Sequence, residues 1–304
     1  MAEHTHEFHF EDLDDVIRTI QFATPRTMRR TSSVREEPHR YGWFRSTSMQ
    51  DAIDLYQNGW REGRERVLAL SDNFKFLDGK PPPKWDFTRQ PTGSVVDIGA
   101  HVMGEPNDMV TWRPPERKRI VITMNLAVWS DVTPGAFYLR GGVATALVDA
   151  LQRYGHDVEV RVAAYSRHYC AQGEGCDRCG EIGYPGQTVN SLVTWPAKKF
   201  HEALDLSALA FSLSHPSAFR RFVFRIRECF LPEIVPGVPM LDVSPHDYGK
   251  SIDIPAESPW RGDVYFGPLT NQVPWFDMKA VTNWFLDELK AQDIEFLRGW
   301  HADG

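Results

Sequence analysis

The sequence has few cysteines and no long apolar run, and these two absences exclude several classes of protein. Only four cysteines occur in 304 residues, and Cys170, Cys176 and Cys179 lie close together, which is not a disulfide framework for a secreted chain. No stretch reaches the ~20 apolar residues that a membrane-spanning helix requires. The acidic start MAEHTHEFHFEDLDD lacks the basic and apolar regions of a signal peptide. We therefore expect a cytoplasmic protein.

Signatures of the common catalytic centres are absent as well. The chain has no GxSxG, HExxH or GxGxxG motif, and no Lys-Ser/Thr pair follows Gly141-Gly142 as in a P-loop. A net charge of −7 argues against bulk affinity for nucleic acid or anionic lipid. With 42% hydrophobic residues the chain is nevertheless typical of a globular protein. We expect no nucleotide cofactor, and none of these motifs is present to indicate a reaction.

The most informative stretch runs from residue 119 to residue 165. Residues 119–129 form an apolar run rich in β-branched side chains, and residues 141–154 repeat apolar side chains at helical spacing. Residues 157–165 again have the composition of a strand. A strand, a helix and a second strand in this order are typical of a parallel sheet with both faces covered. We therefore predict an α/β fold, a three-layer sandwich with a mostly parallel sheet in which strand 119–129 is central.

Composition divides the chain into three parts. Residues 1–45 read as a polar, partly flexible leader, acidic at first and then rich in arginine. Residues 46–110 read as a helical cap and linker, with an N-cap at Ser48 and a segment at 95–103 that is either a strand or an interface. Residues 111–304 read as the α/β domain. Within it, residues 157–168 and 188–195 are expected to pair as an antiparallel hairpin.

The order of the predicted elements over residues 119–292, with that hairpin between the second and third strands, resembles the von Willebrand factor A domain. The resemblance implies an interaction domain. Its metal-adhesion motif, Asp-x-Ser-x-Ser, is degenerate here, so the resemblance implies no Mg²⁺ site. The motif positions are Asn125, Ala127 and Trp129 in one register and Asp131, Thr133 and Gly135 in another.

Three phrases, GWREG, RGGVATALVDAL and SHPSAFRRFVFRIRE, resemble an uncharacterised family associated with actinobacterial phages. The resemblance implies a chain encoded by a phage or another mobile element, and host cytoplasm as its compartment. It implies no biochemical activity.

A ligand site in such a fold is expected at the C-terminal ends of the parallel strands. Backbone N–H groups at a helix start near Gly141-Gly142 would suit an anion, although close packing explains two glycines equally well. An acid–histidine cluster in LDVSPHDYG offers acid–base or metal chemistry, or simply turn-forming residues. The cleft candidates are Asn125, Ser130, Asp131, Thr133, Gly141, Gly142, Asp242, Ser244, His246 and Asp247.

The cysteine cluster is the sharpest local signal. A Cys-x-x-Cys pair bends the chain so that two thiolates meet one tetrahedral ion, and a third thiolate with an imidazole completes a Cys₃His set. The surrounding glycines permit such turns. We predict either a structural zinc at a hairpin tip or an unmetallated polar loop. The predicted ligands are His168, Cys170, Cys176 and Cys179.

Arginines are concentrated in two places, the leader and the helix predicted over residues 217–230. On that helix the phenylalanines are expected to face the core and the arginines to face solvent, where a phosphate-binding face is the alternative. Nucleic acid is therefore a candidate partner beside protein. The arginines in question are Arg29, Arg30, Arg220, Arg221, Arg225 and Arg227.

Two classes of function stay open from the sequence. The first, which it favours, is a non-enzymatic interaction protein built on a degenerate A-type domain with a zinc hairpin and an unidentified protein partner. The second is an enzyme of nucleic-acid or nucleotide metabolism that uses the strand-end cleft. Carboxylates converging on that cleft would favour the enzyme.

Overall fold

The main sheet of the computed structural model is built around a buried central strand. β5 (Arg119–Asn125) lies between β6 (Asp157–Tyr169) and β9 (Val264–Phe266) and is parallel to both, which confirms the predicted central position. The structure describes residues 3–24, 33, 35–37, 44–71, 86–93, 95–113, 118–128, 132–153, 155–169, 188–234, 250–269, 280, 283–284 and 287.

The sheet continues from β6 toward the N-terminus of the chain. β6 pairs antiparallel with β7 (Thr188–Lys198), which confirms the predicted hairpin pairing. β7 in turn pairs in parallel with β1 (Glu3–His9), so the order is β1-β7-β6-β5-β9. A short strand, β8 (Lys250–Ser251), pairs antiparallel with β6 beside this path. The fold is thus α/β with a mostly parallel sheet.

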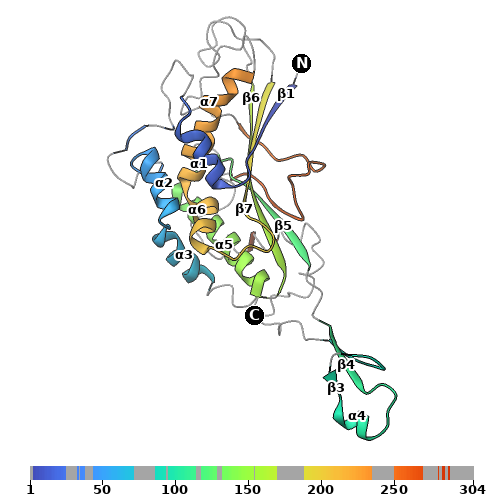
Figure 1. The fold of residues 1–304 in the computed structure, drawn as a ribbon. Helices are drawn as coiled ribbons and strands as arrows, with labels where there is room; N and C mark the ends of the chain where they lie inside the picture. Colours follow the sequence, from blue (N-terminus) through green and yellow to red (C-terminus); the bar gives the residue numbers. More distant parts are fainter. Residues whose placement is uncertain are drawn as a thin grey trace, which may run out of the picture.

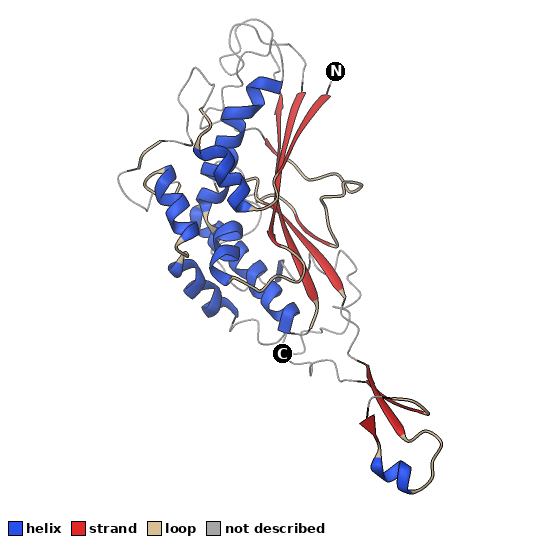
Figure 2. Cartoon of the chain, in the orientation of Figure 1, coloured by secondary structure: helices blue, strands red, loops and turns tan. Residues whose placement is uncertain are grey.

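Helices cover one face of this sheet (Figures 1 and 2). Alternate residues of β5, namely Ile120, Ile122 and Met124, point into that face and are buried against the helices, as the period of two in a strand requires. The helices are α1 (Leu13–Gln21), α2 (Met49–Gln57), α3 (Arg61–Ser71), α5 (Pro134–Arg153), α6 (Leu206–Ser214), the π-helical η2 (Ala218–Val223) and α7 (Phe224–Ile234).

The opposite face of the sheet carries a smaller apolar cluster. Tyr165, Leu192 and Tyr265 pack there against Ile254, which comes from the irregular segment that follows β8. Within the described residues the third layer is therefore this segment and not a layer of helices. Near the C-terminus, residues 280, 283, 284 and 287 are described as helical, and Trp284 packs on the main core beside Phe266.

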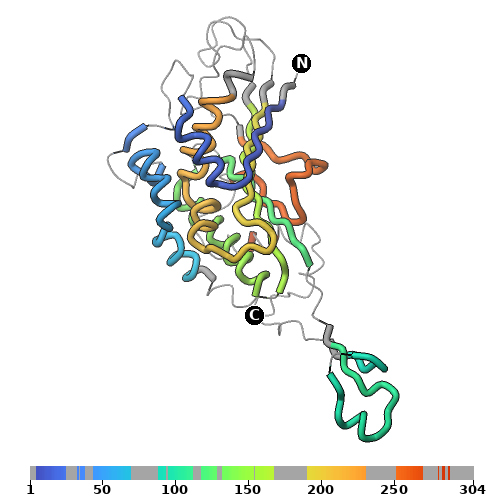
Figure 3. The backbone as a smooth tube through the Cα atoms, viewed as in Figure 1, coloured from blue at the N-terminus to red at the C-terminus, as the bar shows by residue number. Residues whose placement is uncertain are grey.

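The N-terminal residues belong to the sheet unit. Figure 3 shows the first strand running beside β7, although the paired residues are about 185 positions apart in the sequence. Asp12 caps α1 by accepting a hydrogen bond from the Asp15 N–H, and Val16, Ile17 and Ile20 are buried in the main core. The boundary expected at residue 45 thus does not separate β1 and α1 from the α/β unit.

A second, small sheet stands apart from the first (Figure 2). We call it the appendage, residues 86–93 and 95–113. Its strands β2 (Asp86–Gln90), β3 (Val95–Val96) and β4 (Met109–Arg113) are antiparallel in the order β2-β4-β3. A one-turn helix, α4 (Ile98–Val102), follows β3 and is capped by Asp97. None of the described helices, in either unit, is both long and apolar enough to cross a membrane.

Candidate functional site

The first predicted cleft residue, Asn125, is part of a closed hydrogen-bond network. Its amide nitrogen donates to the Ile252 carbonyl (2.9 Å) and the Tyr265 hydroxyl (3.2 Å). Its amide oxygen accepts from the backbone N–H of Ala127 (3.1 Å) and of Tyr165 (3.3 Å). Asn125 is fully buried, so it joins β5 to its neighbours and has no free group for a ligand.

Arg140 seals the same strand ends from the helix side. Its buried guanidinium donates to the carbonyls of Asn125 (2.9 Å), Phe266 (3.0 Å) and Gly267. Burial raises the pKa of the neighbouring Tyr265 hydroxyl to about 12, although the hydrogen bond from Asn125 acts in the opposite direction. This end of the sheet is therefore a structural junction between β5 and β9.

The two glycines expected at a helix start lie inside α5, which begins at Pro134. Their N–H groups are thus not at the helix N-terminus, where the sequence offered an anion site as one of two alternatives. A Cβ at Gly141 would overlap the Leu213 carbonyl and the Ser214 hydroxyl of α6. The glycine therefore permits close contact between two helices, the alternative that the sequence left open, with α6 in place of the sheet.

Several other predicted site residues fall outside the described part of the chain. Thr133 is described and is exposed just before α5. His168 lies at the end of β6, where only its backbone is described. Among the residues that the structure describes, no group of three or more His, Cys, Asp or Glu is placed to hold a metal ion. The residues outside the described part are Ser130, Asp131, Cys170, Cys176, Cys179, Asp242, Ser244, His246 and Asp247.

Three arginines of η2 and α7 are buried, so the expectation that they are solvated is wrong for Arg220, Arg221 and Arg227. Arg225 is half-buried and donates to the Ala23 carbonyl. Arg220 and Arg221 are fully buried and Arg227 nearly so. Arg220 donates to the Val132 carbonyl (2.8 Å) and lies over the Phe137 ring, and its burial lowers its pKa to about 9. Such side chains are not available to a nucleic-acid backbone, and Arg29 and Arg30 lie outside the described residues.

Arg221 ties part of the N-terminal chain to the core. It donates to the carbonyls of Ser33 (2.9 Å), Arg35 (3.0 Å) and Ser46 (2.7 Å), and stacks over Phe44 at 4.3 Å. Burial lowers its pKa to about 10. Buried Glu228 accepts hydrogen bonds from the backbone and hydroxyl of Ser33. These contacts account for Arg221 without a ligand, because its guanidinium satisfies the backbone carbonyls of Ser33, Arg35 and Ser46.

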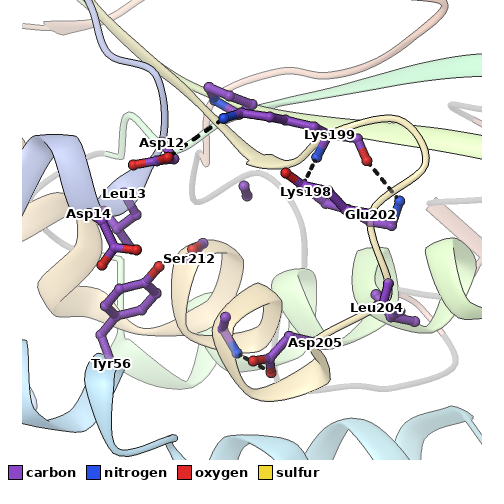
Figure 4. A pocket seen from close by; sticks show the side chains of 14 residues that line it. Asp12, Leu13, Asp14, Tyr56, Lys198, Lys199, Glu202, Leu204, Asp205 and Ser212 are labelled. Atoms are coloured by element: carbon purple, nitrogen blue, oxygen red, sulfur yellow. Dashed lines mark hydrogen bonds and ion pairs between the residues drawn. The ribbon is translucent and has the colours of Figure 1, made fainter.

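A polar pocket lies at the other end of the sheet, where the parallel strands β1 and β7 terminate and α1 and α6 begin (Figure 4). Its volume is about 200 Å³. Asp12 and Asp205 cap the two helices at its rim. The sequence did not point to this site, because β1 was not recognised as a strand. The lining residues are Asp12, Leu13, Asp14, Tyr56, Pro196, Ala197, Lys198, Lys199, Glu202, Ala203, Leu204, Asp205, Ala208 and Ser212.

The appendage exposes a dense set of large apolar side chains. Ile98, Val102 and Met103 are 75%, 79% and 73% exposed, and both residues of β3 are about half exposed. Ile98 and Val102 are four positions apart and share one side of α4. Elsewhere in the described part of the chain, large exposed hydrophobic side chains are limited to Phe22 and Leu68. The appendage is therefore the main apolar surface that the described structure leaves uncovered.

Comparison with protein families decides what the chain is related to. A family model described as "Domain of unknown function (DUF7192)" matches residues 3–286. The chain belongs to the DUF7192 family. No curated protein and no solved structure matches it. The matched range includes β1, the appendage and β9.

Proposed function

We propose that this DUF7192 protein acts without catalysis by binding another protein, and that the appendage is its docking element. The single observation that carries the proposal is the exposure of Ile98, Val102 and Met103 on one small unit. Large apolar side chains left exposed close together in sequence on a folded unit mark interaction sites, because leaving them in water costs free energy that a partner recovers. The closed network around Asn125 supports the non-enzymatic alternative.

The charges around these side chains define the partner. Asp97, Glu105 and Asp108 lie around α4, where Arg89 forms ion pairs with the first two and the His101 ring lies 2.5 Å from Asp108. Arg89 pairs with both Asp97 (2.5 Å) and Glu105 (3.5 Å), so one guanidinium serves two carboxylates. The rim is therefore acidic. We infer a protein segment with an apolar face flanked by lysine or arginine as the occupant.

The same acidic rim disfavours two other occupants. In a symmetric pair of copies, the same patch faces itself and like charges meet, which costs free energy. An anionic bilayer surface repels carboxylates for the same reason. A partner with basic flanks lowers the free energy of association at both the apolar centre and the rim.

The proposal is tested by selecting peptides from a random display library on the full-length protein. We expect enrichment of sequences that combine Leu, Ile or Phe with flanking Lys or Arg. Selection on Ile98→Ser/Val102→Ser should lose these peptides, whereas selection on Phe22→Ser, which removes an exposed apolar side chain elsewhere, should retain them. Peptides without basic residues, or equal recovery on the double variant, would refute the docking site. A dimer that dissociates in the double variant would identify a second copy as the occupant.

We also propose that the α/β unit is a degenerate A-type domain of a phage-associated family. The parallel β5–β6 pair followed by the β6–β7 hairpin supports the resemblance to the von Willebrand factor A domain. Such domains serve interactions, which agrees with docking. In a degenerate motif without carboxylates at Asn125 and Ala127, we expect no micromolar Mg²⁺ binding by calorimetry.

A structural zinc at the tip beyond β6 completes this proposal. Thiolates of Cys170, Cys176 and Cys179, with His168, would hold it as a closed site. Mass spectrometry of protein purified without chelator should find close to one zinc per chain in wild type and a marked loss in Cys176→Ser. A content below ~0.1 zinc per wild-type chain would contradict the site, because closed zinc sites bind far more tightly than that.

A further inference from the structure

The pocket between α1, α2 and α6 contains three polar groups that have no partner among the described residues. Figure 4 shows the Asp14 carboxylate, the Tyr56 hydroxyl and the Ser212 hydroxyl converging from three different helices. No hydrogen bond joins any of them to another described group. Ser212 is 2% exposed and lines this cavity. Buried hydroxyl groups are ordinarily hydrogen-bonded, so a hydroxyl that faces a cavity is available to a ligand there.

Carboxylates outnumber lysines in the lining of this pocket. Tyr56 has its pKa raised by burial and then by the neighbouring carboxylates of Asp14 and Asp12. Negative charge disfavours the phenolate, and the same charge favours a cation placed beside the hydroxyl. The pocket has four carboxylates, Asp12, Asp14, Glu202 and Asp205, against two lysines.

The two lysines do not occupy the open groups. Lys198 donates to the carbonyls of Val158 (2.7 Å) and Lys199 (3.0 Å), and Lys199 lies 3.5 Å from Asp12. Both thus serve the strand side of the pocket, while Asp14, Tyr56 and Ser212 form its helix side (Figure 4). Neither lysine therefore compensates the negative charge on the helix side.

We propose that this pocket binds a primary alkylammonium group. Its N–H donors would be shared by Asp14, Tyr56 and Ser212, all of which can accept hydrogen bonds, and Leu13, Leu204 and Ala208 would line its alkyl stem. A volume of about 200 Å³ suits a small amine or one lysine side chain and excludes a larger ligand. A metal ion is a poorer fit, since the described acidic residues do not form a coordinating group.

The test is titration of the full-length protein with butylamine, followed by the backbone NMR signals of Asp14, Tyr56 and Ser212. The neutral isostere 1-butanol and the anion butyrate serve as comparators. We expect saturable shifts with butylamine only. Asp14→Asn should weaken binding ~10-fold, as expected for a hydrogen bond to a charged group. Asp14 is exposed and is not the α1 cap, so the variant keeps its fold.

Two further variants make the result specific. Ser212→Ala should also weaken butylamine binding, because it removes an acceptor. Asp54→Asn should not, because it removes the same charge from α2 outside the pocket. Equal shifts with 1-butanol, or unchanged affinity in Asp14→Asn, would overturn the proposal.

The source of the ammonium group is distinguished in a second arm. Nα-acetyl-lysine methylamide presents the same group on a peptide-like backbone. Tighter binding of this compound than of butylamine would assign the pocket to a lysine of a partner protein, and the reverse to a free amine. Failure of both compounds to bind would end the proposal and leave the appendage docking site untouched, because the two sites share no residue.

Discussion

At the scale of single residues, the protein buries titratable side chains. Their surroundings either disfavour the charged form or provide hydrogen-bond partners for it. His215 is the clearest case. It stacks on Phe211 at 4.8 Å and meets Trp60 edge-on at 4.7 Å, while its Nδ1 accepts from the Ser217 N–H. Burial lowers the pKa of His215 to about 3, despite Asp51 nearby and with Arg45 and Arg221 adding repulsion. The imidazole is therefore neutral in the folded protein.

This burial predicts a specific loss of stability in mild acid. The folded pKa lies below the unfolded value of 6.5, so the unfolded chain binds the proton first as the pH falls. Stability from His215 is complete above pH 6.5 and decreases below it, by about 2 kcal/mol between pH 7.5 and pH 5. Urea unfolding at the two pH values should show a smaller decrease for His215→Gln than for wild type. Equal decreases would contradict a neutral, buried His215.

Arg221 gives a second prediction at this scale. Replacing it by Met leaves the carbonyls of Ser33 and Ser46 without their donor, and we expect a loss of about 3 kcal/mol in unfolding free energy. Arg64→Met removes an exposed arginine from α3 and should change stability by less than ~0.5 kcal/mol. Denaturant unfolding of both variants decides this; equal effects would mean that the buried hydrogen bonds contribute nothing.

At the scale of elements, the contact between α5 and α6 depends on one missing side chain. Gly141→Ala would gain helix propensity of up to ~1 kcal/mol but would push a methyl group into the Leu213 backbone. We expect the unfolding free energy to fall by about 1–2 kcal/mol in thermal or denaturant unfolding. Gly135→Ala in the same helix meets only the Thr133 hydroxyl at 3.7 Å and should not destabilise. A stabilised Gly141→Ala variant would show that the helices separate at little cost.

The sequence predicted those elements whose own pattern is strong. The apolar run of β5, the hairpin of β6 with β7, and the Ser48 cap all appear where expected, because local propensity and tertiary packing agree there. β1 was missed because its alternating His, Glu and Thr residues read as a solvated leader, and only pairing with the distant β7 makes it a strand. The orientation of Arg220 and Arg221 was missed because the carbonyls that they satisfy come from remote segments.

The candidate sites depended on tertiary structure even more. Asn125 was placed correctly at the end of a parallel strand, but the groups that close around it, Ile252 and Tyr265, lie more than 120 residues away. The pocket at Asp14, Tyr56 and Ser212 brings together three helices with no shared motif. The segment 95–103 was expected as a strand or an interface, and it forms β3 and α4 with exposed apolar side chains.

At the scale of the whole molecule, the described chain consists of an α/β unit and the appendage (Figure 1). The α/β unit buries most of its described large apolar side chains, and hydrogen bonds of Asn125 and Arg140 join its strand ends. The appendage is small, apolar on its outside and acidic at its rim, so it gains most from a partner. The central claim is that this partner docks on α4.

The most direct measurement is calorimetric titration of a selected apolar peptide with basic flanks into the full-length protein and its Ile98→Ser/Val102→Ser variant. Losing two exposed anchors should weaken binding at least ~10-fold, since burial of each such side chain contributes about 1.5–3 kcal/mol. Phe22→Ser should bind like wild type, and raised salt should weaken binding through the rim charges. Equal affinity of the wild type and the double variant would contradict docking on the appendage.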